Sequence, residues 1–239
     1  MTENIFLKTI NLIFPLSCSF CEKYDLLSSK ISICKDCYKE NANTKHNLPK
    51  NICKVCKSDL EGDICHFCSS RNIFFNELFY IKDRNSFESE VIRKIKFGIN
   101  PYLSNYFRIG LHRILNNLKE NKYISIVQIP SNSITLRKRP IPVSEFIINY
   151  LCKRLKIKVL NPIEKKSKEL QSGKSFRERF IHAQNAFIIQ KHFQNNLHGK
   201  YLLVDDVFTT GATVNEIAKL LLMNGAESVD ILVLTKGKI

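Results

Sequence analysis

The sequence lacks any apolar run that approaches the ~20 residues needed for a helix to cross a bilayer. The apolar stretch near its start is interrupted by Lys8 and Asn11, and no small-residue cleavage site follows, as a secretory signal would require. No low-complexity tract and no internal repeat other than paired cysteines is present. These absences argue against a membrane-spanning helix and an exported precursor, and we expect a cytoplasmic protein.

Acidic residues are few compared with basic ones. The 239 residues include 22 Asp+Glu against 37 Lys+Arg, a formal net charge of +15. Such an excess fits a polyanionic partner, although it does not indicate a fold. With 44% apolar residues the chain can bury the core of one or two domains. A disordered tail and a disulfide-stapled mini-protein are excluded.

Cysteine is almost absent after residue 70, where Cys152 alone remains, and we expect it to be a small core residue. The other eight cysteines form four Cys-x-x-Cys pairs: Cys18/Cys21, Cys34/Cys37, Cys53/Cys56 and Cys65/Cys68. Without an export signal, metal binding is a better interpretation of these pairs than disulfides.

Two Cys-x-x-Cys turns complete one tetrahedral zinc site, so four pairs predict one or two structural zinc ions. Sequential pairing is the simplest arrangement, and a cross-braced one is the alternative. Redox dithiols or scattered buried thiols are the other interpretations, but four pairs within about fifty residues favour zinc. His66 lies inside the last pair; it could replace a thiolate, and a spacer is the simpler interpretation.

The composition changes near residue 70, which predicts a cysteine-rich zinc-binding module over 1–72 and a second domain over 73–239. In the second part, short apolar runs alternate with helical patterns. The expected strands are 124–129, 201–204 and 228–234, and the expected helices are 143–155 and 212–223. Strands that alternate with helices predict an α/β fold with a parallel sheet and right-handed crossovers.

The most specific motif runs from Leu202 to Thr213, Leu-Leu-Val-Asp-Asp-Val-Phe-Thr-Thr-Gly-Ala-Thr. A buried strand leads to two acids, then to a Thr/Gly loop and a helix, and ligands of such sheets bind at the carboxyl ends of strands. A helix N-terminus binds anions, and Gly211 allows close approach of a phosphate. Asp205 and Asp206 are better placed to accept hydrogen bonds from sugar hydroxyls, directly or through magnesium. The alternative is an acid pair before an ordinary capped helix.

This string resembles the 5-phosphoribosyl-1-diphosphate (PRPP) signature of type I phosphoribosyltransferases. Together with the cysteine pairs before it, the chain resembles the ComF family of competence proteins. Further similar stretches cover most of the chain: Leu12 to Cys21, Val127 to Pro130, Gln171 to Gly173, Glu178-Arg179 and Ala186-Phe187.

The resemblance implies a type I phosphoribosyltransferase fold, in which helices flank a parallel sheet. It places Asp205 and Asp206 at the ribose hydroxyls and the turn at Ser131 near the diphosphate, with magnesium accompanying PRPP. The residues implied around the 5-phosphate are Val207, Thr209, Thr210, Gly211, Ala212 and Thr213. The chain departs from the family at Arg139 to Val143, where only the arginine matches, and at His182, where asparagine is usual. Both departures fall where an acceptor would bind.

Transfer of a phosphoribosyl group requires positioning and cationic stabilisation of the departing diphosphate. Guanidinium groups suit phosphates, and the candidates are Arg137, Arg139, Arg177 and Arg179. Arg139 and Arg179, with the two acids, are the residues we expect to act in catalysis. A solvated basic face is the alternative interpretation of the arginines, and no general base for an acceptor is identifiable.

The positive charge is concentrated in residues 137–179, which hold thirteen bases and four acids. Such a cluster suits contact with a phosphate backbone and predicts binding of single-stranded DNA. A solvated face is again the alternative, and only Phe146, Tyr150 and Phe176 could stack on bases there.

The first hypothesis is thus a ComF-like protein that binds PRPP and single-stranded DNA and supports DNA uptake in natural transformation, with competence-machinery proteins as further partners. The competence role is implied by the resemblance alone. A phosphoribosyltransferase of nucleotide salvage or biosynthesis is the second hypothesis. A non-catalytic zinc-bearing adaptor is the third.

Overall fold

The computed structural model describes residues 17–42, 51–130, 143–166 and 186–237. Its first cysteine segment, 17–42, contains the helices α2 (Ser28–Ile31) and α3 (Lys35–Ala42). The second cysteine segment, 51–74, contains α4 (His66–Ser69). The longer helices that follow are α5 (Ser86–Lys96), α6 (Ser104–Glu120), α8 (Val143–Leu155) and α10 (Ala212–Met223). Two 3-10 turns, η1 (Pro101–Leu103) and η2 (Lys191–Phe193), complete the helical elements of the described residues.

The centre of the fold is a parallel sheet of five strands in the order β1-β7-β6-β2-β3. Their bounds are β1 (Leu78–Asp83), β2 (Ser125–Gln128), β3 (Lys158–Leu160), β6 (Lys200–Phe208) and β7 (Ser228–Lys236). A separate antiparallel pair joins β4 (Ile163–Lys165) to β5 (Phe187–Ile189). Because β6 lies between β7 and β2, its carboxyl end is at the middle of the sheet edge.

The sheet is buried on both faces, as the continuous apolar run of β6 indicates. Side chains alternate along a strand, so Leu202 and Val204 join one apolar cluster while Tyr201 and Leu203 join the other. All four side chains are at most 2% exposed. The core therefore consists of two layers that share the sheet.

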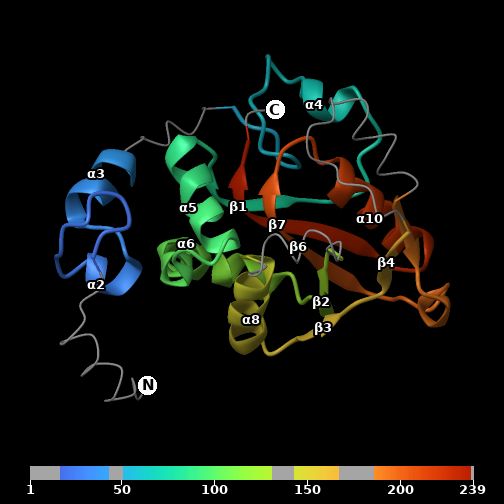
Figure 1. Cartoon of the computed structure of the whole chain (residues 1–239). Coiled ribbons are helices and arrows are strands. Elements are labelled where there is room, and N and C mark those ends of the chain that lie inside the picture. Colours follow the sequence, from blue (N-terminus) through green and yellow to red (C-terminus); the bar gives the residue numbers. More distant parts are fainter. Residues whose placement is uncertain (1–16, 43–50, 131–142, 167–185, 238–239) are drawn as a thin grey trace.

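One layer contains α5, α6 and α8 together with Ile31 and Ile33 of the first cysteine segment. The other contains α10, the β4–β5 pair and residues of the second cysteine segment, including Phe67. Figure 1 shows the two cysteine segments well apart, with the first lying beyond α5 on the side away from the sheet. The two cysteine segments thus lie on opposite sides of one sheet, the first of them separated from it by the α5–α6 layer.

The predicted α/β class is confirmed, with a parallel sheet, flanking helices and a cysteine-rich N-terminal part. The helices expected over 143–155 and 212–223 have these bounds in the structure. The strand expected over 201–204 continues to Phe208, because β7 pairs with it as far as Lys236. Cys152 is partly buried against the first apolar cluster, as expected.

Among the described residues, no helix is both long and apolar enough to cross a membrane. The boundary expected near residue 72 stays a prediction. Across it, the backbone N–H of Phe74 donates to Asn215 Oδ1 of α10 at 2.8 Å, and Asn215 Nδ2 donates to the carbonyl of Asn72 at 2.9 Å. The end of the second cysteine segment is therefore fastened to the helix that follows the acid pair.

Candidate functional site

The two acids of the motif lie inside strand β6, near its carboxyl end, and not in the loop after it. The backbone N–H of Asp206 donates to Asp205 Oδ1 at 2.8 Å, which turns the Asp205 carboxylate back towards the chain. Burial and the neighbouring charge of Asp206 raise the pKa of Asp205 to about 7. Two carboxyl groups at this edge can accept hydrogen bonds from a pair of vicinal hydroxyls.

A lysine that sequence reasoning missed reaches this acid pair. The ammonium of Lys96, the last residue of α5, forms an ion pair with Asp206 Oδ2. Both side chains are about one-fifth exposed, at 19% and 20%. The acid pair therefore has a fixed cation beside it, supplied by a helix more than a hundred residues earlier in the chain.

The loop after β6 depends on a glycine. Gly211 adopts a left-handed conformation with φ +70° and forms the N-cap of α10. A Cβ at this position would lie 2.7 Å from Phe208 Cζ and 3.3 Å from Phe67 Cζ. The close packing and the backbone conformation both require glycine.

The N-terminus of α10 is placed to receive an anion. Gly211 has no side chain to cap the helix, and the N–H of Ala212 donates a long hydrogen bond to Thr210 Oγ1 at 3.3 Å. Backbone N–H groups at a helix start carry partial positive charge and point out of the helix. Thr209, Thr210 and Thr213 surround this turn, so the arrangement suits a phosphate group.

A cavity of about 610 Å³ opens beside this loop. Its lining includes Thr209 and Thr210 of the loop and Phe67 and Arg71 of the second cysteine segment. The guanidinium of Arg71 lies 4.0 Å from the centre of the Phe67 ring. Arg84, after β1, also lines the cavity, and its Nε donates to Ser89 Oγ at 2.9 Å. Sequence reasoning singled out neither arginine.

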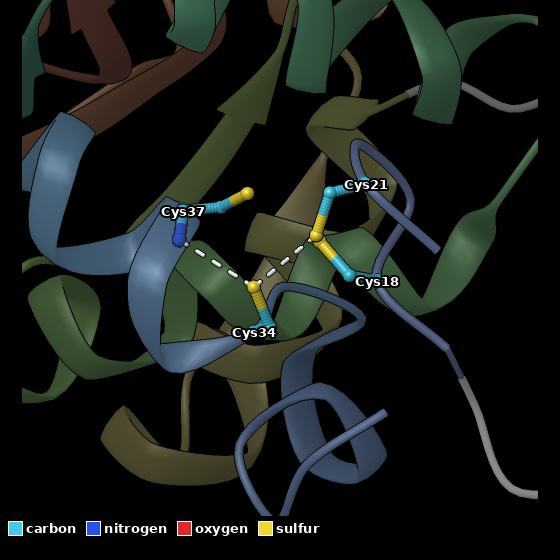
Figure 2. A group of neighbouring side chains, drawn as sticks. All are labelled: Cys18, Cys21, Cys34 and Cys37. Atoms are coloured by element: carbon cyan, nitrogen blue, oxygen red, sulfur yellow. Dashed lines mark hydrogen bonds between the residues drawn. The ribbon is translucent and has the colours of Figure 1, made fainter. Parts of the chain in front are cut away.

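The first cysteine group comprises Cys18, Cys21, Cys34 and Cys37, whose sulfur atoms lie within 4.8 Å of one another. Figure 2 shows the four side chains turned towards a common centre. Cys21 Sγ and Cys34 Sγ are 3.5 Å apart, and the N–H of Cys37 donates to Cys34 Sγ at 3.4 Å. These are the two pairs that sequential pairing combines.

The second cysteine group comprises Cys53, Cys56, Cys65 and Cys68, again within 4.8 Å. Cys53 Sγ is 3.8 Å from Cys68 Sγ, and Cys56 Sγ is 3.4 Å from Cys65 Sγ. His66 is not part of this group; its Nε2 lies 2.8 Å from Glu61 Oε2. The structure therefore shows sequential pairing in both groups and His66 as a spacer.

Both groups have the donor set and spacing that zinc requires. Four thiolates around zinc at ~2.3 Å stand roughly 3.8 Å apart, close to the sulfur distances in both groups. Burial opposes ionisation of Cys18, but backbone N–H groups outweigh it and lower the pKa of Cys18 to about 7. Burial and the neighbouring sulfurs raise the pKa of Cys37 instead. Because each thiolate opposes the ionisation of its neighbours, all four thiols of a group ionise together only around a cation. Both cysteine groups could therefore bind zinc.

Several predicted site residues lie outside the described residues: Ser131, Arg137, Arg139, Arg177, Arg179 and His182. Of the basic segment, the structure describes 143–166. Lys153, Lys156 and Lys158 are exposed there. Lys158 begins β3 and pairs with Ser125 at the start of β2, so these bases lie at the amino edge of the sheet. The acid pair lies at the opposite, carboxyl edge.

The sequence contains only a weak signal for Lys96. Phe87, Val91, Ile92 and Ile95 are buried at helical spacing, which predicts the helix and its apolar face. A lysine at the C-terminal end of such a helix is ordinary, because it suits the helix dipole. Its proximity to Asp206 follows from tertiary packing alone.

The chain has a relative along nearly its full length. It is 25% identical over 226 residues to competence protein F of Haemophilus influenzae, covering 91% of this chain and 96% of that protein. This chain is similar to competence protein F, as its sequence predicted. No protein-family profile matches it.

Two solved structures of adenine phosphoribosyltransferases show partial similarity. One has a TM-score of 0.37 and 17% identity and covers 59% of this chain and 73% of its own. The other, from Thermoanaerobacter pseudethanolicus, has a TM-score of 0.35 and 16% identity, with coverages of 59% and 83%.

Proposed function

We propose that this ComF-like chain binds PRPP at the carboxyl end of β6. The ribose hydroxyls would contact Asp205 and Asp206, and the 5-phosphate would occupy the turn from Val207 to Thr213. The observation that carries the proposal is the placement of an acid pair at the central strand end, followed five residues later by a left-handed glycine that begins a helix. The similarity to competence protein F supports it.

PRPP would bring a cation of its own to the carboxyl edge of the sheet, where Asp205 and Asp206 lie. Its diphosphate would bring magnesium, which prefers oxygen ligands. The chain would place the sugar by its hydroxyls and its 5-phosphate, and Arg139 and Arg179 would provide cations for the diphosphate. Ser131 would approach the same group from the turn after β2. Whether transfer to an acceptor follows is tested by release of diphosphate when nucleobases or amines are added.

Calorimetry with PRPP and magnesium tests the binding site. We expect the wild type to bind and Asp206→Asn to lose at least tenfold in affinity, because the carboxylate is the stronger acceptor. The matched control is Asp36→Asn, which removes the same charge from a side chain that is 80% exposed in the first cysteine segment. Equal binding by wild type and Asp206→Asn, or by neither, would contradict the proposal.

We propose further that the chain acts in DNA uptake and contacts single-stranded DNA, with other competence proteins as partners. The similarity to competence protein F and the excess of bases in 137–179 support this role. The exposed Lys153, Lys156 and Lys158 would bind DNA at the amino edge of the sheet. PRPP and DNA would then occupy opposite edges of the sheet.

Fluorescence anisotropy with a labelled single strand tests the DNA contact. Affinity should fall steeply with salt, and charge reversal at Lys153, Lys156 and Lys158 should weaken binding at least tenfold without sequence preference. Charge reversal at the exposed Lys30, Lys35 and Lys39 is the control with the same change in net charge. An equal loss in both triple variants would show that net charge alone attracts the DNA. Salt-independent binding would contradict the contact.

A further inference from the structure

The ion pair between Lys96 and Asp206 lies at the acid pair, where the proposed function places the ribose hydroxyls. Asp206 stands next to Asp205 in β6, and the two carboxyl groups interact electrostatically. Carboxylate oxygens are the ligands that a hard divalent cation prefers. The ammonium of Lys96 contacts one of these carboxylate oxygens. A lysine ammonium is a compact charge that can take the position of a metal ion beside a carboxylate.

The helix that carries Lys96 is held firmly. At its start, the side chain of Asn85 accepts a hydrogen bond from the N–H of Glu88 at 3.0 Å. Glu88 is buried and accepts a hydrogen bond from the hydroxyl of Tyr106 on α6 at 2.8 Å. The ring of Phe87 stacks on Phe20 of the first cysteine segment with centroids 4.4 Å apart. The position of Lys96 is therefore set by packing on both sides of α5.

A neighbouring lysine on the same helix makes different contacts. Lys94 Nζ lies 3.8 Å from Glu90 Oε1 and 5.6 Å from the centre of the Phe20 ring. Its side chain is as exposed as that of Lys96, at 19%. The two lysines carry the same charge at the same depth, and only Lys96 reaches the acid pair.

We propose that Lys96 is a built-in cation at the sugar end of the proposed PRPP site, which neutralises Asp206 and keeps divalent metal ions off the acid pair. A sugar phosphate would then bind this end without a metal ion, and magnesium would enter only with a diphosphate. Naming the ligand as a sugar phosphate rests on the proposed function. The exclusion of metal ions rests on the ion pair alone, so the two can fail separately.

Binding of Mn²⁺ to the full-length protein, followed by electron paramagnetic resonance, tests the exclusion. We expect Lys96→Met to gain one Mn²⁺ site that is at least tenfold tighter than any in the wild type. Lys94→Met should titrate like the wild type. In the double variant Lys96→Met/Asp206→Asn the gained site should disappear. Identical titrations of wild type and Lys96→Met, or a gained site that survives Asp206→Asn, would overturn the proposal.

Binding of ribose 5-phosphate, which has no diphosphate, tests the second part. The wild type should bind it equally, within about twofold, with and without magnesium, whereas Lys96→Met should bind only when magnesium is present. Binding by the wild type that requires magnesium would overturn the proposal. No binding by any variant, alongside a gained Mn²⁺ site, would contradict the proposed function and leave Lys96 as the excluding cation.

Two further variants keep the test valid if Lys96→Met does not fold. Lys96→Gln keeps a long polar side chain at the end of α5 without the charge, and Lys96→Arg keeps the charge. We expect Lys96→Gln to gain the Mn²⁺ site and Lys96→Arg to exclude it, with circular dichroism confirming that both are folded. A folded Lys96→Gln without the site would overturn the proposal even if Lys96→Met does not fold.

Discussion

The ring of Phe67, between two cysteines of the second group, lies 5.9 Å from the ring of Phe208 at the end of β6. Phe67 is 6% exposed and Phe208 is 1% exposed. The next residues after Phe208 form the turn proposed to hold a phosphate. The second cysteine group therefore supports the loop of the candidate site through the contact between Phe67 and Phe208.

Substitution of one cysteine of the second group should affect this loop. In Cys56→Ser the zinc content should fall from two ions to one per chain, because a tetrahedral site loses a ligand. PRPP affinity should fall with it, since Phe67 loses its support. Metal analysis and calorimetry provide the measurements. Cys152→Ser, outside both groups, should keep both ions, and an unchanged zinc content in Cys56→Ser would contradict the assignment.

Gly211→Ala should destabilise the fold by roughly 2–4 kcal/mol, because a left-handed backbone costs ~1–2 kcal/mol and the added methyl group collides with Phe208. Gly62→Ala is a matched control. Its φ is +61°, and nothing lies within 4 Å of the added Cβ. In urea unfolding, Gly211→Ala should therefore lose more free energy of unfolding than Gly62→Ala, and the difference should equal the cost of the collision with Phe208. Equal losses would show that Phe208 and Phe67 give way to the methyl group.

The pKa of Asp205, raised to about 7 by burial and by Asp206, predicts a pH-dependent stability. Between about pH 4 and pH 7 the folded chain holds a proton on Asp205 that the unfolded chain has released. This contribution to the free energy of unfolding therefore falls as pH rises. Relative to the wild type, the free energy of unfolding of Asp205→Asn should rise by on the order of 4 kcal/mol between pH 4 and pH 8. A constant difference across this range in urea unfolding would contradict the raised pKa.

Tyr123→Phe should cost about 1–3 kcal/mol, because it removes a hydrogen bond to a buried carboxylate. The hydroxyl of Tyr123 donates to Asp230 Oδ2 at 2.7 Å, and Tyr123 is 6% exposed. Tyr102→Phe, at a residue that is 52% exposed, should change the free energy of unfolding by less than about 0.5 kcal/mol. Equal stability of Tyr123→Phe and the wild type would show that the hydroxyl adds nothing there.

Sequence patterns predicted the elements whose apolar period is regular. The helix over 143–155 and the strands around the acid pair follow from spacing, and the cysteine pairs follow from zinc geometry. What the patterns could not predict are contacts between distant segments. Lys96 beside Asp206 and Phe67 behind Gly211 depend on how the helices cover the sheet. Such contacts leave no periodic signal in a single sequence.

The strand order has a consequence for how the chain folds during synthesis. Within the sheet β1 pairs with β7 alone, although β7 begins about 150 residues after β1, and Asn76 donates to the carbonyl of Val229 at 2.8 Å. Both cysteine segments leave the ribosome before the strands and helices on which they pack. Contacts between such distant residues form late and slowly. During synthesis the second cysteine segment would therefore keep its local shape before β6 and α10, on which it packs, have been made.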